Sequence, residues 1–491
     1  MAITPGANLN LTPLPQKYAD TSNYIDFTAS GTNWSQQYLP DLMEKEAEVF
    51  GKRTISGFLA QIGAEEAMTA DQVVWSEQGR LHLHYNGTTD GTAEKIVIGN
   101  DIDGRTAGAN HGIRVNDTLL VSSATGTFNA ICTGVSGVDV FIELYDGTDI
   151  TTTIGGSTAV TVLVYGSEYG KGQSYRSGDD GVASNFANSD TRTANEPQFQ
   201  THTNKPIILK DYYEINGSDT SQIGWVEVTT EEGQGGYLWY LKAASETKMR
   251  FTDYLEMAML ESVKNSAAAG STDVDALLGM AGNANFGTQG LFDAIAKRGN
   301  TTSGVTGVNA ATDLAEFDAI LAEFDKQGAI EENMMFIDRS TSLAIDDMLA
   351  SMNSYGAGGT SYGVFNNSED MALNLGFSGF RRGSYDFYKS DFRYLNDKGT
   401  RGGLLDSVTN IRGVIIPAGT STVYDGTLGK NLTRPFLHVR YRASQTDDRR
   451  LKTWVTGSVG AATTALDAMQ VHYLSERCLV TQGANNFMLM K

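Results

Sequence analysis

Two short glycine-containing motifs hold residue types that could bind phosphate or calcium. Gly166-Ser-Glu-Tyr-Gly-Lys171 resembles a phosphate-binding loop, but its glycines are one residue too close together, and Gly172 stands where Ser or Thr would hold magnesium. Asp101-Ile-Asp-Gly104 resembles the start of a calcium loop, but Arg105 follows the glycine and breaks the pattern of oxygen ligands. We therefore interpret both motifs as turns.

Histidine and cysteine spacing offers one further possibility of a metal site. His82 and His84 are two residues apart on an expected strand, so their side chains share a face. The other histidines show no partnering pattern, and we interpret Cys132 and Cys478 as small buried apolar residues. The sequence also lacks a Gly-x-Ser-x-Gly, His-Glu-x-x-His or Cys-x-x-Cys motif. It therefore predicts no catalytic residue, no cofactor and no metal site, and we expect a protein that is not an enzyme.

A basic stretch near the C-terminus could bind nucleic acid or another subunit. Its basic residues are interleaved with Phe436, Tyr441 and Trp454, and they are Arg434, Arg440, Arg442, Arg449, Arg450 and Lys452. Asp447 and Asp448 interrupt the run, and arginine in strands often pairs with carboxylates across an interface. We favour salt bridges between subunits, with Arg434, Arg440 and Arg442 as candidate contacts, over weak DNA contact.

The first forty residues predict an extended arm. They contain four of the eight prolines, which exclude helix and sheet interiors. They also contain aromatic side chains that need a surface to cover them. We expect this arm to dock on a neighbouring subunit, and the candidate contacts are Tyr18, Tyr24, Phe27 and Trp34.

Composition limits the class of protein. The chain has 491 residues, a net charge of −21 and only two cysteines, so it holds several substructures and no disulfide framework. It has neither an apolar run long enough to span a membrane nor a secretory signal, so we expect no membrane partner. Residues 81–240 carry 8 basic and 20 acidic residues, whereas residues 381–491 carry 16 and 9. This asymmetry indicates two regions with different neighbours.

The first half of the chain predicts a helix and then mainly strands. A helix is expected over residues 41–62, followed by an alternating strand that ends at Tyr85. Residues 86–170 contain short β-rich runs at 95–98, 113–121, 128–135, 138–145 and 159–165, and Ser136-Gly137 predicts a tight hairpin. We expect a small inserted β-barrel or sandwich. The strand that ends at Tyr85 should pair with a return strand within residues 204–215.

The second half predicts mixed helices and strands. Apolar spacing predicts a long helix over residues 237–265 and amphipathic helices at 290–297 and 314–327. A buried strand follows at 334–337, then a helix at 340–352 that Asp338 or Ser340 caps. The last segment should join a short helix from Ala465 to a strand at 475–480.

This order of elements resembles the major capsid protein of tailed bacteriophages, the Hong-Kong-97-type fold. Three segments are similar to segments of that family: Glu332-Asn-Met-Met-Phe-Ile-Asp-Arg339, Ser342-Leu-Ala-Ile-Asp-Asp-Met348 and Gly413-Val-Ile-Ile-Pro417. The resemblance implies an α+β fold with an N-arm, E-loop, spine helix, peripheral domain and axial domain, plus an inserted all-β domain. The implied divisions are an N-arm (1–40), a helix with the first E-loop strand (41–85), the insertion (86–170), the second part of the E-loop (171–236), the spine helix and peripheral domain (237–354), the axial domain (355–465) and a C-terminal return to the peripheral domain (466–491).

The resemblance also implies a function. Copies of the chain would assemble as hexamers and pentamers into an icosahedral head around double-stranded DNA, which they would contact weakly and without specificity. Portal, scaffold and auxiliary or decoration proteins would be further partners. Assembly would take place in the host cytoplasm, and the chain would become part of the virion. The net acidity fits a shell that must not adhere to its DNA.

Two alternatives belong to other classes. The chain could be an adhesin or decoration protein whose β insertion binds carbohydrate through Phe128, Phe141, Tyr145 or Tyr165. Core packing also explains those aromatic residues. A glycan-degrading enzyme would need a carboxylate pair, which the sequence does not single out.

Overall fold

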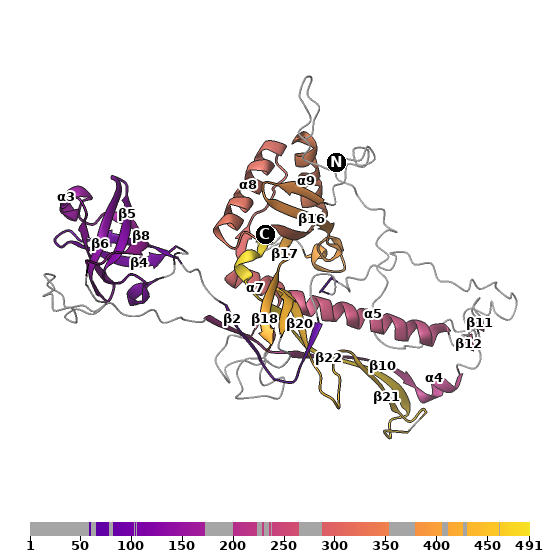
Figure 1. Ribbon diagram of the computed structural model, residues 1–491. Helices are drawn as coiled ribbons and strands as arrows, with labels where there is room; N and C mark the ends of the chain where they lie inside the picture. Colours follow the sequence, from indigo (N-terminus) through magenta and orange to yellow (C-terminus); the bar gives the residue numbers. More distant parts are fainter. Residues whose placement is uncertain are drawn as a thin grey trace. The chain divides into compact units, whose positions relative to one another are not determined.

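The computed structural model describes residues 58–59, 65–77, 82–102, 104, 106–171, 200–222, 228–229, 235–236, 238–264, 287–352, 379–404, 411–425, 430–460 and 462–491. Within these ranges the chain forms a mixed α+β structure with two compact units (Figure 1). The first unit contains the described residues up to Trp75 and from His202 onward. The second contains those between Ser76 and Thr201.

Six strands of the second unit close into a barrel. Around the barrel they are β3 (His84–Thr89), β4 (Lys95–Asp101), β7 (Asp139–Leu144), β6 (Gly126–Ser136), β5 (Asp117–Ser123) and β8 (Ala159–Ser167). Alternate side chains, including Ile96, Leu119 and Val162, fill the interior completely shielded from solvent. A short helix, α3 (Ile150–Thr153), and a 3-10 turn, η3 (Gly108–Asn110), complete the unit. Gly137 has a positive φ of 62° in the turn between β6 and β7, where a tight hairpin requires it.

The expected partner of the strand that ends at Tyr85 is wrong. Tyr85 lies in β3, which pairs with β4 and β8 inside the barrel. The return segment instead forms β9 (Gln200–Asn204) and β10 (Ile207–Asn216). Of these, β9 pairs with β2 (Val73–Glu77), and β10 pairs with a strand near the C-terminus. Alternation identifies a strand but does not identify its neighbour.

A long sheet and a long helix form one part of the first unit. The sheet has the order β1 (Glu65–Met68), β20 (Leu437–Arg442), β22 (Ala468–Thr481) and β10, and β21 (Lys452–Gly457) also pairs with β22. The helix α5 (Leu238–Glu261) confirms the long helix that the sequence predicts, and its 24 residues span about 36 Å. It runs along β10 and β22 (Figure 1), where Phe251 and Leu255 pack on Val471 and Tyr473.

A six-stranded sheet forms the other part of the first unit. Its order is β13 (Asn300–Thr302), β23 (Met488–Met490), β17 (Gly413–Pro417), β14 (Glu332–Ile337), β16 (Tyr385–Asp391) and β15 (Gly379–Arg382). The helices α8 (Ala310–Lys326) and α9 (Arg339–Met352) pack on it through a core that includes Phe317, Ile345 and Phe387. Asp338 caps α9 by accepting a hydrogen bond from the backbone N–H of Thr341 at 3.0 Å.

This sheet crosses the division that the sequence suggests between residues 354 and 355. Strand β14 lies before that division, whereas its neighbours β16 and β17 lie after it. The expected helix from Ala465 is wrong, because β22 is one continuous strand from Ala468. A further apolar cluster, which includes Phe58, Met259, Phe336, Leu437 and Leu489, packs elements of both sheets together.

The remaining elements are short. They are α4 (Gly217–Gln222), α7 (Leu291–Arg298), α10 (Arg393–Asn396), η5 (Arg401–Gly403), η6 (Ala484–Asn486), β11 (Val228–Thr229), β12 (Gly235–Gly236), β18 (Thr420–Asp425) and β19 (Lys430–Pro435). None of the helices in the described ranges is long and apolar enough to cross a membrane.

Candidate interaction sites

Arginine side chains of β20 face carboxylates of the N-terminal part of the unit. The parallel register of β1 and β20 sets Glu66 beside Arg440, and Arg440 Nη2 lies 2.9 Å from Glu66 Oε2. Arg442 Nε donates to Glu476 Oε1 at 2.8 Å, and its Nη2 pairs with Asp71. The hydrogen bond to Asp71 is the main cause that raises the pKa of Arg442. Side chains far apart in sequence therefore pair here within one chain.

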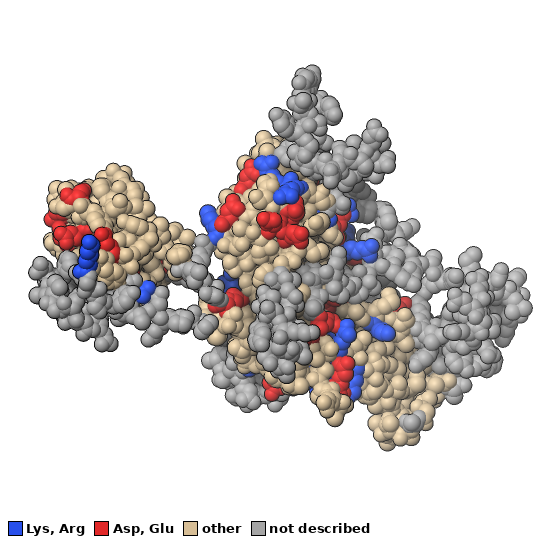
Figure 2. Space-filling model, in the orientation of Figure 1, with Lys and Arg blue, Asp and Glu red and all other residues tan. Residues whose placement is uncertain are grey.

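More ion pairs extend this cluster. Glu65 Oε2 lies 2.5 Å from Arg450 Nε, and Arg477 Nη1 lies 3.5 Å from Glu65 Oε1. Arg449 Nε lies 3.1 Å from Glu476 Oε2. Burial lowers the pKa of Arg477, and the nearby charge of Glu65 opposes that shift. Figure 2 likewise shows basic and acidic side chains lying next to one another on the face that it presents.

These ion pairs explain how β1, a strand of only four residues, stays attached at the edge of the sheet. It also neutralises guanidinium charges that a DNA backbone would need. Contact between Arg440 or Arg442 and another subunit stays a prediction. Arg434 lies in β19, opposite Ser421 in the pairing with β18.

The two-stranded ribbon of β2 and β9 is anchored at its root by a buried amide. Asn204 is 1% exposed, and its Nδ2 donates to the carbonyl oxygens of Leu479 at 2.6 Å and Gln289 at 3.1 Å. Its Oδ1 accepts from the backbone N–H of Gln289 at 2.8 Å and from Thr288 Oγ1 at 3.2 Å. The amide is therefore bonded on both its oxygen and its nitrogen, and it joins β9, β22 and the turn before α7.

An aromatic contact fixes the other strand of the ribbon. The Trp75 ring centroid on β2 lies 6.0 Å from that of His202 on β9. The guanidinium carbon of Arg298, at the end of α7, lies 5.5 Å from the Trp75 ring centroid. Arg298 Nη2 also donates to the carbonyl oxygen of Thr481 at 3.4 Å. Both strands are thus attached to β22 or to its neighbours.

The long sheet carries an aromatic ladder on the face opposite α5. Cross-strand register brings Tyr212 of β10, His472 of β22 and Trp454 of β21 into one row. The His472 ring centroid lies 5.9 Å from that of Tyr212 and 5.1 Å from that of Trp454, with the rings stacked. Tyr212 is 53% exposed, and Ile208 on the same face of β10 is 52% exposed. Helix α5 packs on the opposite face of this sheet, against Val471 and Tyr473.

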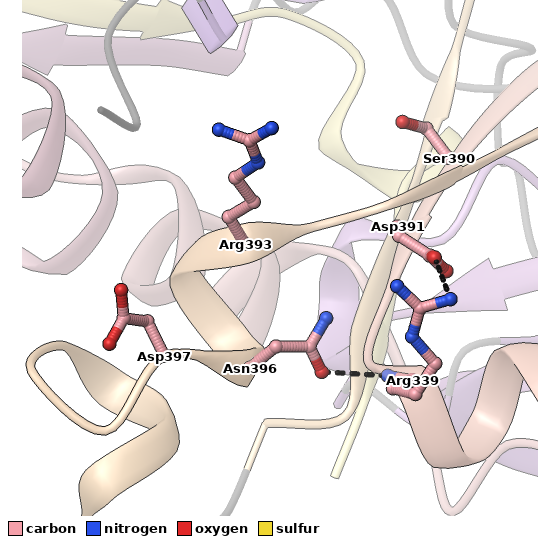
Figure 3. Close-up of a pocket in the computed structure, with 6 residues that line it drawn as sticks. All are labelled: Arg339, Ser390, Asp391, Arg393, Asn396 and Asp397. Atoms are coloured by element: carbon pink, nitrogen blue, oxygen red, sulfur yellow. Dashed lines mark hydrogen bonds and ion pairs between the residues drawn. The ribbon is translucent and has the colours of Figure 1, made fainter. Parts of the chain in front are cut away.

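A shallow pocket of about 520 Å³ lies at the end of β16 and the start of α9. Arg339 Nη1 lies 2.6 Å from Asp391 Oδ2, and the backbone N–H of Arg339 donates to Asn396 Oδ1 at 2.8 Å. Figure 3 shows the Arg393 side chain pointing away from that pair. The lining comprises Arg339, Ser390, Asp391, Arg393, Asn396 and Asp397, and it holds neither histidine nor lysine. Its charged and amide side chains suit contact with polar groups.

The structure places the remaining sequence candidates as follows. Tyr18, Tyr24, Phe27 and Trp34 lie outside the described residues. His84 opens β3. Cys132 and Cys478 are free and buried, which confirms the interpretation made from the sequence. In the described ranges no group of three or more His, Cys, Asp or Glu side chains could hold a metal ion.

Sequence reasoning missed the anchoring residues. Asn204 precedes Lys205-Pro206, and nothing in that pattern distinguishes a buried amide from a turn residue. Glu65, Glu66 and Asp71 were not candidates either, because their arginine partners lie more than 360 residues away along the chain. No local signal could have paired them.

Comparisons with known proteins find only a loose likeness. No family model matches the chain, and no curated protein matches its sequence. It is similar to a solved structure titled "Capsid structure of the Cyanophage P-SCSP1u", with a TM-score of 0.41 and 7% identity over 96% of this chain and 98% of that one. It is also similar to structures titled "Mycobacterium phage Ogopogo" (TM-score 0.38, 11% identity, 93% and 97% covered) and "Microbacterium phage Oxtober96" (TM-score 0.38, 8% identity, 95% and 99% covered). Likeness at this level is too weak to carry a functional argument.

Proposed function

We propose that this chain is the major capsid protein of a tailed bacteriophage with a Hong-Kong-97-type fold. Its copies assemble as hexamers and pentamers into an icosahedral head that encloses double-stranded DNA. In this proposal α5 is the spine helix, the β2–β9 ribbon is the base of the E-loop, and the barrel is the inserted domain. Residues 237–354, which include α8 and α9, belong to the peripheral domain, residues 355–465 form the axial domain, and residues 466–491 return to the peripheral domain. The six-stranded sheet therefore contains strands of both domains.

The observation that supports this proposal most directly is the aromatic ladder of Tyr212, His472 and Trp454. A sheet face that presents exposed aromatic and aliphatic side chains, such as Tyr212 and Ile208, among charged ones is typical of an interaction surface. A shell subunit meets several neighbours, and such faces become buried when copies tile together. The described pocket holds no combination of residues typical of a catalytic site. We therefore favour an interaction surface as the role of this fold.

The proposed shell also has proposed contacts and partners. Residues 1–40 would lie on a neighbouring subunit through Tyr18, Tyr24, Phe27 and Trp34. Arg434, Arg440 and Arg442 are further candidate contacts. Portal, scaffold and decoration proteins would join the shell in the host cytoplasm. DNA would be held only by weak contacts, because the chain carries a net charge of −21.

The barrel gives little support to the carbohydrate-binding alternative. Phe128 packs against the barrel core, and Phe141 is only partly exposed. Tyr145 and Tyr165 are exposed, and the Tyr145 hydroxyl donates to Glu168 Oε2 at 2.5 Å. The phenol oxygen is thus already engaged within the barrel.

Purified full-length chain tests the proposal by analytical ultracentrifugation and negative-stain electron microscopy, alone and with the proteins expressed from neighbouring phage genes. We expect rings, tubes or closed particles. A variant that lacks residues 1–40 should stay folded, with the helical circular dichroism of α5 and its neighbours, but should lose assembly. A full-length chain that remains monomeric at high concentration under both conditions, and binds glycan, would support the adhesin instead.

A further inference from the structure

Strand β10 is a long edge strand. The order of its sheet ends at β10, and no strand in the described part of the chain pairs with its outer edge. It has ten residues, from Ile207 to Asn216, which is long for an unprotected edge. Unpaired N–H and C=O groups along such an edge can accept another strand.

Two hydrogen bonds show which residues direct their backbone groups outward. The N–H of Gly217, one residue beyond β10, donates to Asp467 O at 3.1 Å, on the β22 side. Backbone groups alternate along a strand, so the odd-numbered residues of β10 bond to β22 and the even-numbered residues face the free edge. In agreement, the N–H of Tyr212 donates to the side-chain Oδ1 of Asp211 at 2.9 Å rather than to β22.

The side chains along this edge are self-complementary. We propose that β10 pairs antiparallel with β10 of a second copy, across a two-fold axis at Tyr212. In this register Lys210 lies opposite Glu214 of the second copy, and Glu214 lies opposite its Lys210. Opposite charges at facing positions stabilise an antiparallel pair. Each facing pair of even-numbered residues exchanges two backbone hydrogen bonds.

The charges favour this register over its neighbours. A two-fold axis at Lys210 would place two lysines opposite each other, and an axis at Glu214 would place two carboxylates opposite each other. Both arrangements are destabilising. The axis at Tyr212 also sets Leu209 opposite Ile215 of the second copy, but Ile215 is buried and Leu209 packs under α5 in its own copy, so charge rather than apolar contact selects the register. Asp211 would give up the N–H of Tyr212 but keep Arg250, whose Nη2 lies 3.5 Å from its Oδ2.

Such a contact is weak by itself. A single pair of strands buries less surface than a stable protein interface requires. Within a lattice, however, each copy is held by several contacts, which raises the effective concentration of the strands. The strand pairing therefore rests on the proposed function, because shell assembly supplies the strength that one pair of strands lacks.

A cysteine at the axis tests the register directly. In the Tyr212→Cys variant two cysteines would face each other at a Cα separation of about 5.5 Å, which a disulfide spans. We expect a covalent dimer under mild oxidation, both in solution and in particles. The Lys210→Cys variant is the matched control, because its cysteines would lie four positions apart and should not cross-link. Equal cross-linking of both variants, or of neither, would overturn the proposed register.

Charge reversal provides a second test. Lys210→Glu alone and Glu214→Lys alone each place like charges opposite each other, and particle yield should fall several-fold. The double variant, and an equal mixture of the two single variants, restore opposite charges and should recover the yield. Normal particles from both single variants would show that assembly occurs without this contact. Failure of the unaltered chain to assemble would instead count against the proposed function.

Discussion

Asn204 donates a hydrogen bond of 2.6 Å from its Nδ2 to the carbonyl oxygen of Leu479, a residue 275 positions further along the chain. The bond joins the ribbon that leads toward the barrel to the central strand β22. Because the amide is buried and bonded on both of its polar atoms, its removal would leave several polar groups without partners.

We therefore expect Asn204→Ala to lower the free energy of unfolding by about 3 kcal/mol. The loss arises mainly from the unsatisfied backbone groups of Leu479 and Gln289. Urea denaturation followed by tryptophan fluorescence measures it. Asn216→Ala, at the exposed end of β10, is the control and should change stability by less than about 0.5 kcal/mol. Equal effects of the two variants would show that the buried amide is not an anchor.

Variants of Glu66 and Arg440 can distinguish an effect on folding from an effect on assembly. Arg440→Glu places two carboxylates together and should cost about 1 kcal/mol of stability, since the pair is partly exposed. The double variant Glu66→Arg with Arg440→Glu should regain that stability. If Arg440 also contacts a neighbouring subunit, the double variant stays folded but still gives fewer particles. Thermal unfolding and particle yield, measured on the same samples, distinguish the two roles.

A buried ion pair ties α9 to β16. Lys389 Nζ pairs with Asp346, and it donates to the carbonyl oxygen of Ser342 at 3.2 Å. Lys389→Met leaves the Asp346 carboxylate buried without this cation, and we expect a loss of about 3 kcal/mol or more. The double variant Lys389→Met with Asp346→Leu removes both charges and should recover most of the stability. A double variant as unstable as the single one would contradict this view.

Tyr385 should make stability depend on alkaline pH. Burial, helped by a hydrogen bond to Asp325 Oδ1 at 2.5 Å, raises the pKa of Tyr385 to about 12 from 10.0. The neutral phenol is favoured in the folded state, so this contribution of about 2 kcal/mol is complete below pH 10 and is lost as the pH rises through 12. Tyr385→Phe should be less stable than the unaltered chain at pH 8, and the difference should shrink by pH 12. A constant difference in unfolding free energy across that range would argue against the shift.

Periodicity predicts the longer described helices, but the helix expected from Ala465 is wrong, and the one expected over residues 41–62 lies outside the described residues except at 58–59. The amphipathic spacing of α5 and α8 and the Asp338 cap of α9 are local properties, so the sequence shows them directly. The barrel strands and the Gly137 hairpin are also local patterns. Pairing between distant strands has no such signature. For this reason the strand that the sequence ends at Tyr85 overlaps β3 only at His84 and Tyr85, and its expected neighbour is wrong.

The residues of the candidate interaction sites also fall into those that the sequence identifies and those that it does not. Sequence composition identifies a cluster of arginines that needs carboxylates, but it cannot show that β1 supplies Glu65 and Glu66 within the same chain. The outward direction of the Tyr212 N–H depends on the register between β10 and β22, which only tertiary structure defines. Residues that act through long-range register are therefore the ones that sequence reasoning misses.

The chain leaves the first unit along β2 and re-enters it along β9, the strand to which β2 is hydrogen-bonded. Its exit and entry points are consequently neighbours, and the anchors Trp75 and Asn204 belong to the first unit rather than to the barrel. The barrel is therefore joined to the first unit at two points that lie side by side on paired strands. A change in the length of the barrel segment between these two junctions therefore leaves the strand pairing of the two sheets of the first unit unaltered.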